Sequence, residues 1–160
     1  MRNLKVKTFI KIIFLVSLFS IISAYFIEYV LGHQPCNLCL IERIPYGLAM
    51  VLIIFNHISI KNERFIILLL ILVFFFSLVI SFYHFGIEQD IFEESSVCGL
   101  KDASNIVSKE ELLKQLQVKN VSCKDVTFRI FGLSLTSYNV LISFIISTST
   151  AKIYFNYEKA

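Results

Sequence analysis

The sequence predicts an all-α membrane protein, a four-transmembrane-helix bundle, and three observations lead to that fold class. The chain has 160 residues, is 56% hydrophobic and has a mean hydropathy of +0.73, which is too apolar for an ordinary soluble domain. Four apolar runs reach or approach the roughly 20 residues that a helix needs to cross the hydrocarbon core of a bilayer. These runs lack the two-residue alternation of strands in a membrane barrel, so helix is the expected structure.

We expect the four spans to cover about residues 9–31, 44–60, 65–85 and 130–151, within a single domain of residues 1–160. The first span follows a basic stretch, as the core of a secretory signal does, but it is longer than such a core, and we interpret it as an uncleaved span. The second span is the shortest. The third and fourth contain no Asp, Glu, Lys or Arg.

The distribution of Lys and Arg predicts which side of the membrane each loop occupies. Basic residues gather in residues 1–8, 61–64 and 152–160, which we place in the cytoplasm together with both termini. The loops of residues 32–43 and 86–129 then lie on the opposite side, which in a bacterial inner membrane is the periplasm. The net charge is only +3 and forms no continuous basic stripe, so nucleic-acid binding has little support.

All four cysteines fall in the two predicted periplasmic loops. Cys36 and Cys39 form a Cys-x-x-Cys motif in the first loop, while Cys98 and Cys123 lie in the second. One alternative is a zinc site of four thiolates. We favour redox chemistry and expect no metal, because Cys98 and Cys123 are not a second close-spaced pair and the periplasm is oxidising.

The Cys-x-x-Cys motif stands at the outer mouth of the second span, directly after Pro35. If a helix begins near Cys36, its free backbone N–H groups and its dipole stabilise a thiolate there. Arg43 follows Cys39 by about one helical turn and adds positive potential. A thiol of low pKa is a good leaving group in disulfide exchange, so the motif predicts a redox-active pair.

Three stretches resemble the DsbB family, named for disulfide bond formation protein B. Pro35-Cys36-Asn37-Leu38-Cys39-Leu40-Ile41-Glu42-Arg43 is similar to the family signature Pro-Cys-x-Leu-Cys-x-x-x-Arg. The second match is Cys123 together with Phe131-Gly132-Leu133-Ser134. The third is Tyr83-His84-Phe85-Gly86-Ile87-Glu88. The family often has Trp shortly after the last cysteine, where this chain has Phe128.

The resemblance implies a quinone-dependent oxidoreductase that generates protein disulfides. In that scheme Cys98 and Cys123 form an outer disulfide that oxidises a periplasmic DsbA-like thiol oxidase, and Cys123 then exchanges with Cys36. Cys39 passes the electrons to a quinone near Arg43, and the quinone is drawn from the membrane lipid pool. Ubiquinone is favoured over menaquinone as the cofactor.

Other polar residues carry weaker expectations. His84 and Glu28, at outer ends of spans, either contribute to the quinone pocket or sit at the interface, and Glu42 is expected to be solvated or paired. Polar residues of the last span, such as Asn139, suggest hydrogen bonds between helices. In the second loop, a capping box beginning at Ser108 and followed by three leucines predicts a short amphipathic helix on the membrane surface.

Two other functions are compatible with these features. A quinone reductase of the vitamin K epoxide reductase type is also a small helical bundle with Cys-x-x-Cys, but there the close-spaced pair is expected near the start of the last span. A non-enzymatic membrane protein could use its cysteines to staple loops or to bind metal, and such cysteines would be inert to quinone.

Overall fold

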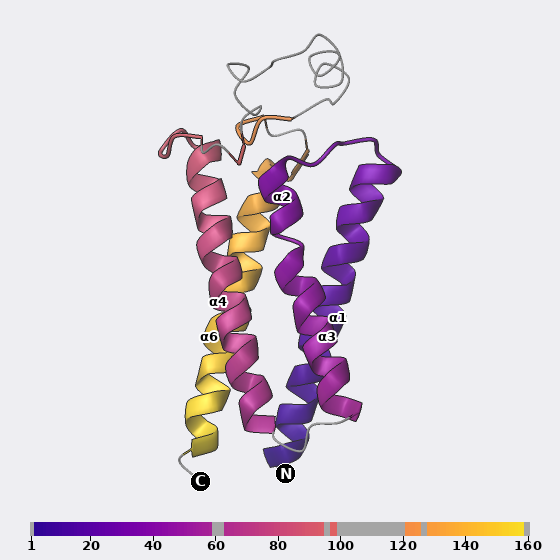
Figure 1. The fold of residues 1–160 in the computed structure, drawn as a ribbon, viewed down its shortest axis with the longest axis vertical. Helices are drawn as coiled ribbons and strands as arrows, with labels where there is room; N and C mark the ends of the chain where they lie inside the picture. Colours follow the sequence, from indigo (N-terminus) through magenta and orange to yellow (C-terminus); the bar gives the residue numbers. More distant parts are fainter. Residues whose placement is uncertain (1, 59–62, 95–96, 99–120, 126–127, 159–160) are drawn as a thin grey trace, which may run out of the picture.

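The computed structural model describes residues 2–58, 63–94, 97–98, 121–125 and 128–158. The long helices stand side by side, and both ends of the described chain lie at one end of the bundle (Figure 1). The opposite end carries a short helix and a two-stranded hairpin. In chain order the elements are α1 (Arg2–Tyr29), α2 (Asn37–Ile41), α3 (Ile44–Ile58), α4 (Glu63–Glu88), β1 (Arg129–Ile130), β2 (Leu133–Ser134) and α6 (Leu135–Glu158).

Three segments among the described residues are long and apolar enough to cross a membrane: Val6–Tyr29, Asn37–Ile58 and Glu63–Glu88. Many of their large apolar side chains face outward; Phe19, for example, is 73% exposed. Such a surface suits lipid rather than water. The sequence of α6 contains many Ser and Thr residues, which lower its hydropathy although it has 24 residues. A fourth crossing by α6 therefore stays a prediction.

The predicted loop of residues 32–43 is only partly a loop. Gly32 adopts a φ of +73° just after α1, a conformation that glycine accepts without strain, and it ends the helical path there. The chain becomes helical again at Asn37, so α2 and α3 together form the single apolar segment Asn37–Ile58. The second column thus begins seven residues before the predicted residue 44, because Cys36 caps the new helix with its side chain.

The start of the last predicted span at residue 130 is wrong as a helix boundary. Arg129 pairs with Ser134 and Ile130 with Leu133 in a small antiparallel hairpin, and α6 begins at Leu135. Phe131 and Gly132 turn the chain with φ values of 49° and 82°. A two-residue turn of this kind reverses an apolar stretch, which hydropathy alone does not reveal. The predicted amphipathic helix near residues 108–116 lies outside the described residues.

Two apolar clusters hold the bundle together. The larger fills the middle of the bundle and the half that carries the chain ends, with Ile66, Leu70 and Phe74 of α4 fully buried. Between α4 and α6, small polar residues replace bulky ones, and Ser77 and Ser143 share a hydrogen bond of 2.9 Å. These contacts confirm the expectation that polar residues of the last helix bond across the bundle. The smaller cluster lies at the other end and contains the cysteines.

Candidate redox site

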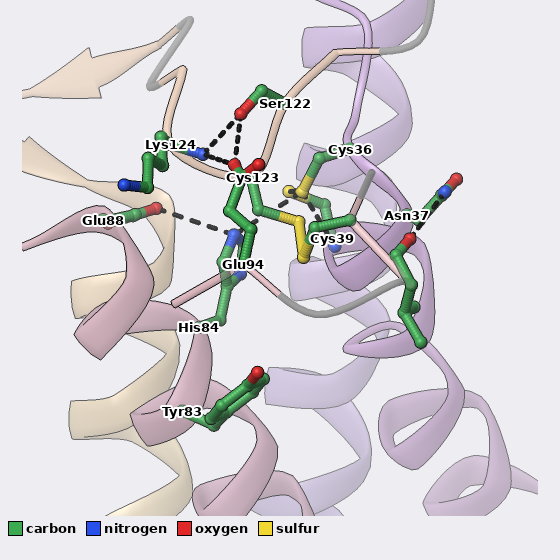
Figure 2. Close-up of a disulfide and its surroundings, with 12 residues drawn as sticks. Cys36, Asn37, Cys39, Tyr83, His84, Glu88, Glu94, Ser122, Cys123 and Lys124 are labelled. Carbon is green, nitrogen blue, oxygen red and sulfur yellow. Dashed lines mark hydrogen bonds and ion pairs between the residues drawn. A yellow bond between two sulfur atoms is a disulfide. The ribbon is translucent and has the colours of Figure 1, made fainter. Parts of the chain in front are cut away.

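Both cysteine pairs belong to one buried cluster at the end of the bundle where α2 begins. Cys36, Cys98 and Cys123 are each 5% exposed or less, and they pack with Leu38 of α2 and Ile87 of α4. Cys39 and Tyr83 contact the edge of this cluster. Figure 2 shows the disulfide beside the Cys36 and Cys39 side chains. Segments far apart in the sequence therefore bring four sulfur atoms into one small apolar region.

Cys98 and Cys123 form a disulfide with a Cα–Cα distance of 5.5 Å. This is the pairing that the family resemblance implied. A sulfur in a disulfide is not a thiolate ligand, so the alternative of one zinc ion held by all four cysteines is wrong for this structure.

Polar contacts fix the disulfide against the helix ends. The Lys124 backbone N–H donates to the Glu94 carboxylate at 3.1 Å, and the Lys124 ammonium donates to Asp90 at 2.6 Å. Asp90 lies just beyond α4, so the Cys123 segment is tied to that helix. On the other side, the Asn37 amide donates to the carbonyl oxygen of Val97 at 2.8 Å. Asn37, next to Cys36, is thus hydrogen-bonded to Val97, next to Cys98, and this contact keeps the two cysteine pairs together.

Cys36 is poised as a thiolate. It is the N-cap of α2, and its sulfur accepts the Cys39 backbone N–H at 3.2 Å; this meets the condition under which the sequence favours a thiolate at Cys36. The Cys36 and Cys39 sulfurs lie 2.6 Å apart. A hydrogen bond from the Cys39 thiol, helped by a hydrogen bond and positive charge from His84, lowers the pKa of Cys36 to about 5 against the opposing effect of burial. Cys36 is therefore largely ionised at neutral pH when the pair is reduced.

His84 of α4 contacts both the redox pair and a buried carboxylate. Its Nε2 lies 3.5 Å from the Cys36 sulfur, and its Nδ1 lies 2.8 Å from Oε1 of Glu42. The side chain is 1% exposed. Glu88, one turn along α4, places a second carboxylate oxygen 3.9 Å from Nε2. With its Nδ1–H donated to Glu42, the imidazole directs Nε2 at the sulfur and can exchange a proton with it.

Glu42 is buried, which corrects the expectation that it could be solvated and supports the expectation that it is paired. It is 7% exposed and accepts the Asn139 amide of α6 at 2.8 Å as well as His84. Asn139 also donates to Ser81 of α4 at 2.7 Å and accepts the Tyr46 hydroxyl. One asparagine thus links three helices around the carboxylate. Polar residues inside apolar runs were the sequence signal for this network, but their partners could not be named from it.

Arg43 and Glu28 meet where α2 and α3 approach α1. The Arg43 Nη1 donates to Glu28 Oε2 at 2.5 Å, and the guanidinium carbon lies 5.0 Å from the centre of the Tyr25 ring. Glu28 is therefore an ion-pair partner, not an isolated interfacial acid. The predicted quinone contact of Arg43 is not tested by these contacts and stays a prediction.

A cavity of about 480 Å³ opens beside the redox pair, and it is lined by side chains of α1 and α6 and by residues near Cys123 and in the hairpin. Cys36, Cys39 and Cys123 line it, together with Arg43 and His84. Its volume is in the range of pockets that hold small organic ligands, and most of its exposed lining is apolar. The arrangement can therefore hold a flat apolar molecule next to a reactive thiol pair.

Cys36, Cys39 and His84 also offer three possible metal ligands, whose atoms all lie within 4.8 Å of one another. Two sulfurs on one tetrahedral zinc ion with bonds of about 2.3 Å would stand roughly 3.8 Å apart. The 2.6 Å between the Cys36 and Cys39 sulfurs is much shorter. The expectation that this group holds no metal stays a prediction.

Comparison with known proteins gives one family and one relative. The model of the family described as disulfide bond formation protein DsbB matches residues 6–152. An uncharacterised protein of Rickettsia prowazekii (strain Madrid E) is 26% identical over 135 residues, which cover 80% of this chain and 76% of that protein. No solved structure matches the chain. The family match includes both cysteine pairs, His84 and Arg43.

Proposed function

The chain belongs to the DsbB family and is a membrane disulfide oxidoreductase; from this premise we propose that it reoxidises a periplasmic DsbA-like thiol oxidase and passes the electrons to a quinone. One observation carries the proposal: both cysteine pairs lie in one buried cluster that opens on an apolar cavity. A pair that only stapled loops would need no such neighbour. The close-spaced pair also begins the second apolar segment, not the last, which separates the chain from the vitamin K epoxide reductase pattern.

We propose a four-span topology in the bacterial inner membrane, with both termini cytoplasmic and the cysteines periplasmic. The described chain ends lie at one end of the bundle and α2, which Cys36 of the cysteine cluster caps, lies at the other (Figure 1). The basic flanks predicted to be cytoplasmic are at the chain-end side. After reduction, a membrane-impermeant thiol reagent added to intact spheroplasts should label Cys98 and Cys123; labelling only after the membrane is opened would invert this topology.

The proposed reaction begins with thiol–disulfide exchange. A partner thiolate attacks Cys98, breaks the bond to Cys123 and forms a mixed disulfide. The second partner thiol then displaces Cys98, so the partner leaves oxidised. Cys98 and Cys123 are left reduced, with the two electrons and two protons of the partner. Cys123 next attacks Cys36 of an oxidised Cys36–Cys39 pair, and Cys98 resolves the new bond. The outer pair is a disulfide again, and Cys36 and Cys39 are now reduced.

His84 is proposed to handle a proton at the inner pair. Its Nε2 faces the Cys36 sulfur at 3.5 Å, so it can take up the proton of Cys36 when the inner pair is reduced and release it as the inner disulfide re-forms. Glu42 holds Nδ1 of the ring and stabilises the imidazolium that results. Both groups are withdrawn from water, where a fixed hydrogen bond orients the ring with little reorganisation.

The residues around the cavity fit a quinone headgroup. Its walls are mainly apolar, and Cys39, Arg43 and His84 are among the polar groups that line it. A quinone, when bound, supplies a two-electron, two-proton acceptor that diffuses in the lipid. Arg43 would hold it by donating to a carbonyl oxygen, and Cys39 would face it. Such an oxidant is needed because a DsbA-type partner has a reduction potential of about −120 mV, and a glutathione pool with a potential of about −180 to −210 mV cannot reoxidise it.

The test is a coupled assay with the purified full-length protein, a reduced DsbA-like protein and a soluble ubiquinone analogue. Quinone absorbance should fall as the partner becomes oxidised. In the Cys39→Ser variant, quinone absorbance should stay constant. Partner oxidation without loss of quinone absorbance by the wild-type protein would refute the proposal.

A further inference from the structure

We propose that Glu28 is a positioning residue for Arg43: its carboxylate fixes the guanidinium at the rim of the cavity, ready to donate to a quinone oxygen. The inference rests on the proposed function, because it assigns a role within the quinone site. It adds a residue of α1, a helix that carries none of the cysteines, to that site.

The contacts of Arg43 fix its side chain from two sides. Nη1 bonds to Glu28 at 2.5 Å, and the Tyr25 ring lies 5.0 Å from the guanidinium carbon, one turn earlier on α1. The side chains of Arg43 and Glu28 are only 17% and 21% exposed. An ion pair so shielded from water is screened less than a surface pair and holds its geometry better.

The pair leaves Arg43 able to bind something else. A guanidinium has five N–H donors in a planar fork, and the bond to Glu28 is made by Nη1. Arg43 lines the cavity, as do Ala24 and Ile27 on the α1 turn that ends at Glu28. The same stretch of α1 thus forms a wall of the cavity and anchors the arginine at its rim.

The physical benefit is preorganisation. A free arginine side chain has many rotamers, and a ligand that binds it must order them at a cost in affinity. Glu28 and Tyr25 order the side chain before any ligand arrives. Removing the carboxylate should therefore weaken quinone binding even though Arg43 keeps its charge. A carboxylate that acted only as a general acid or base would instead change turnover.

The experiment measures quinone KM and kcat for Glu28→Gln, Glu28→Asp and wild type in the full-length protein with a reduced DsbA-like partner. We expect Glu28→Gln to raise quinone KM roughly 5-fold or more, with a much smaller change in kcat. Glu28→Asp keeps the charge on a shorter side chain and should give an intermediate KM. The rate of the first exchange with the partner should not change.

Glu63→Gln is the matched control, because Glu63 pairs with Lys7 at 4.0 Å at the other end of the bundle. It makes the same chemical change and should leave quinone KM at the wild-type value. The decisive comparison repeats Glu28→Gln in an Arg43→Gln background, where it should have no further effect on KM. Equal effects in both backgrounds would show that Glu28 does not act through Arg43.

The outcomes separate this inference from the proposed function. If the wild-type protein fails to reduce quinone, the proposed function fails. If wild type reduces quinone and folded Glu28→Gln has its normal KM, only the role of Glu28 is overturned. Should Glu28→Gln not accumulate as folded protein, Glu28→Asp decides: a wild-type KM contradicts positioning by the longer carboxylate, and a raised KM supports it.

Discussion

Replacing His84 with Gln should weaken the ionisation of Cys36, and the size of the effect follows from the site. In the reduced protein the pKa of Cys36 is lowered to about 5, first by the hydrogen bond from Cys39 and then by the hydrogen bond and charge of His84. A hydrogen bond to a charged group contributes roughly 1.5–3 kcal/mol, which is about one to two pH units in a titration midpoint. The Cys39 contribution remains in the variant.

A depressed pKa means that the thiolate is present above its midpoint and is lost as the pH falls through it. At pH 5 about half of the wild-type Cys36 is thiolate, whereas the variant with a midpoint about one to two units higher holds roughly 1–10%. The rate of alkylation by iodoacetamide at pH 5 should therefore fall about 5- to 50-fold. Near pH 9 the two rates should converge, because both proteins are then ionised.

The assay is the pH–rate profile of Cys36 alkylation, followed by mass spectrometry of the Cys36 peptide. Cys98 and Cys123 are replaced by Ala so that only the inner pair reacts. His57→Gln is the matched control, since His57 is an exposed residue near the far end of α3. An unchanged midpoint in a folded His84→Gln variant would refute the role of His84 in ionising Cys36.

Three further predictions concern other parts of the account. Arg43→Gln should raise quinone KM roughly 10- to 150-fold, because a charged hydrogen bond is lost; a normal KM in the folded variant would remove Arg43 from the site. A reduced partner whose second, resolving cysteine is replaced by Ala should be trapped in a mixed disulfide with Cys98, visible on a non-reducing gel, because it breaks the Cys98–Cys123 bond and then cannot displace Cys98; the absence of this species would contradict the order of exchange. Gly86→Ala should lower the free energy of unfolding by about 1–3 kcal/mol, because the new methyl group meets the Phe92 ring. An unaltered melting temperature would show that the Phe92 ring moves aside freely.

The sequence, with the family resemblance, predicted the helices and the Cys98–Cys123 pairing better than it predicted the contacts between distant side chains. Long apolar runs identify helices because the bilayer demands length and hydropathy, and Cys-x-x-Cys followed by Arg43 is a specific pattern. The helix start at Cys36 was raised only as a possibility, and the second span was predicted to begin at residue 44, seven residues after α2 begins. The hairpin at residues 129–134 was not predicted, because Phe131 and Gly132 turn the chain within a stretch that is apolar almost throughout.

Contacts between distant helices were beyond the sequence. His84 is 48 positions from Cys36, and Asn139 is 97 from Glu42, so no local spacing relates them. An acid, a histidine and an amide in apolar surroundings indicate buried polar pairing but not which group meets which. Glu28 and Arg43 illustrate the same limit: each was singled out separately, and only the packing of α1 against α3 brings their segments together.

The most direct test of the central claim is an anaerobic titration of the fully reduced protein with a ubiquinone analogue. Oxidising four thiols to two disulfides releases four electrons, and each quinone accepts two. Wild type should therefore consume two equivalents of quinone, and the variant with both Cys98 and Cys123 replaced by Ala should consume one. The variant with Cys36 and Cys39 replaced should consume none. Quinone consumption by that last variant would contradict the account, because electrons from Cys98 and Cys123 would then reach quinone without the inner pair.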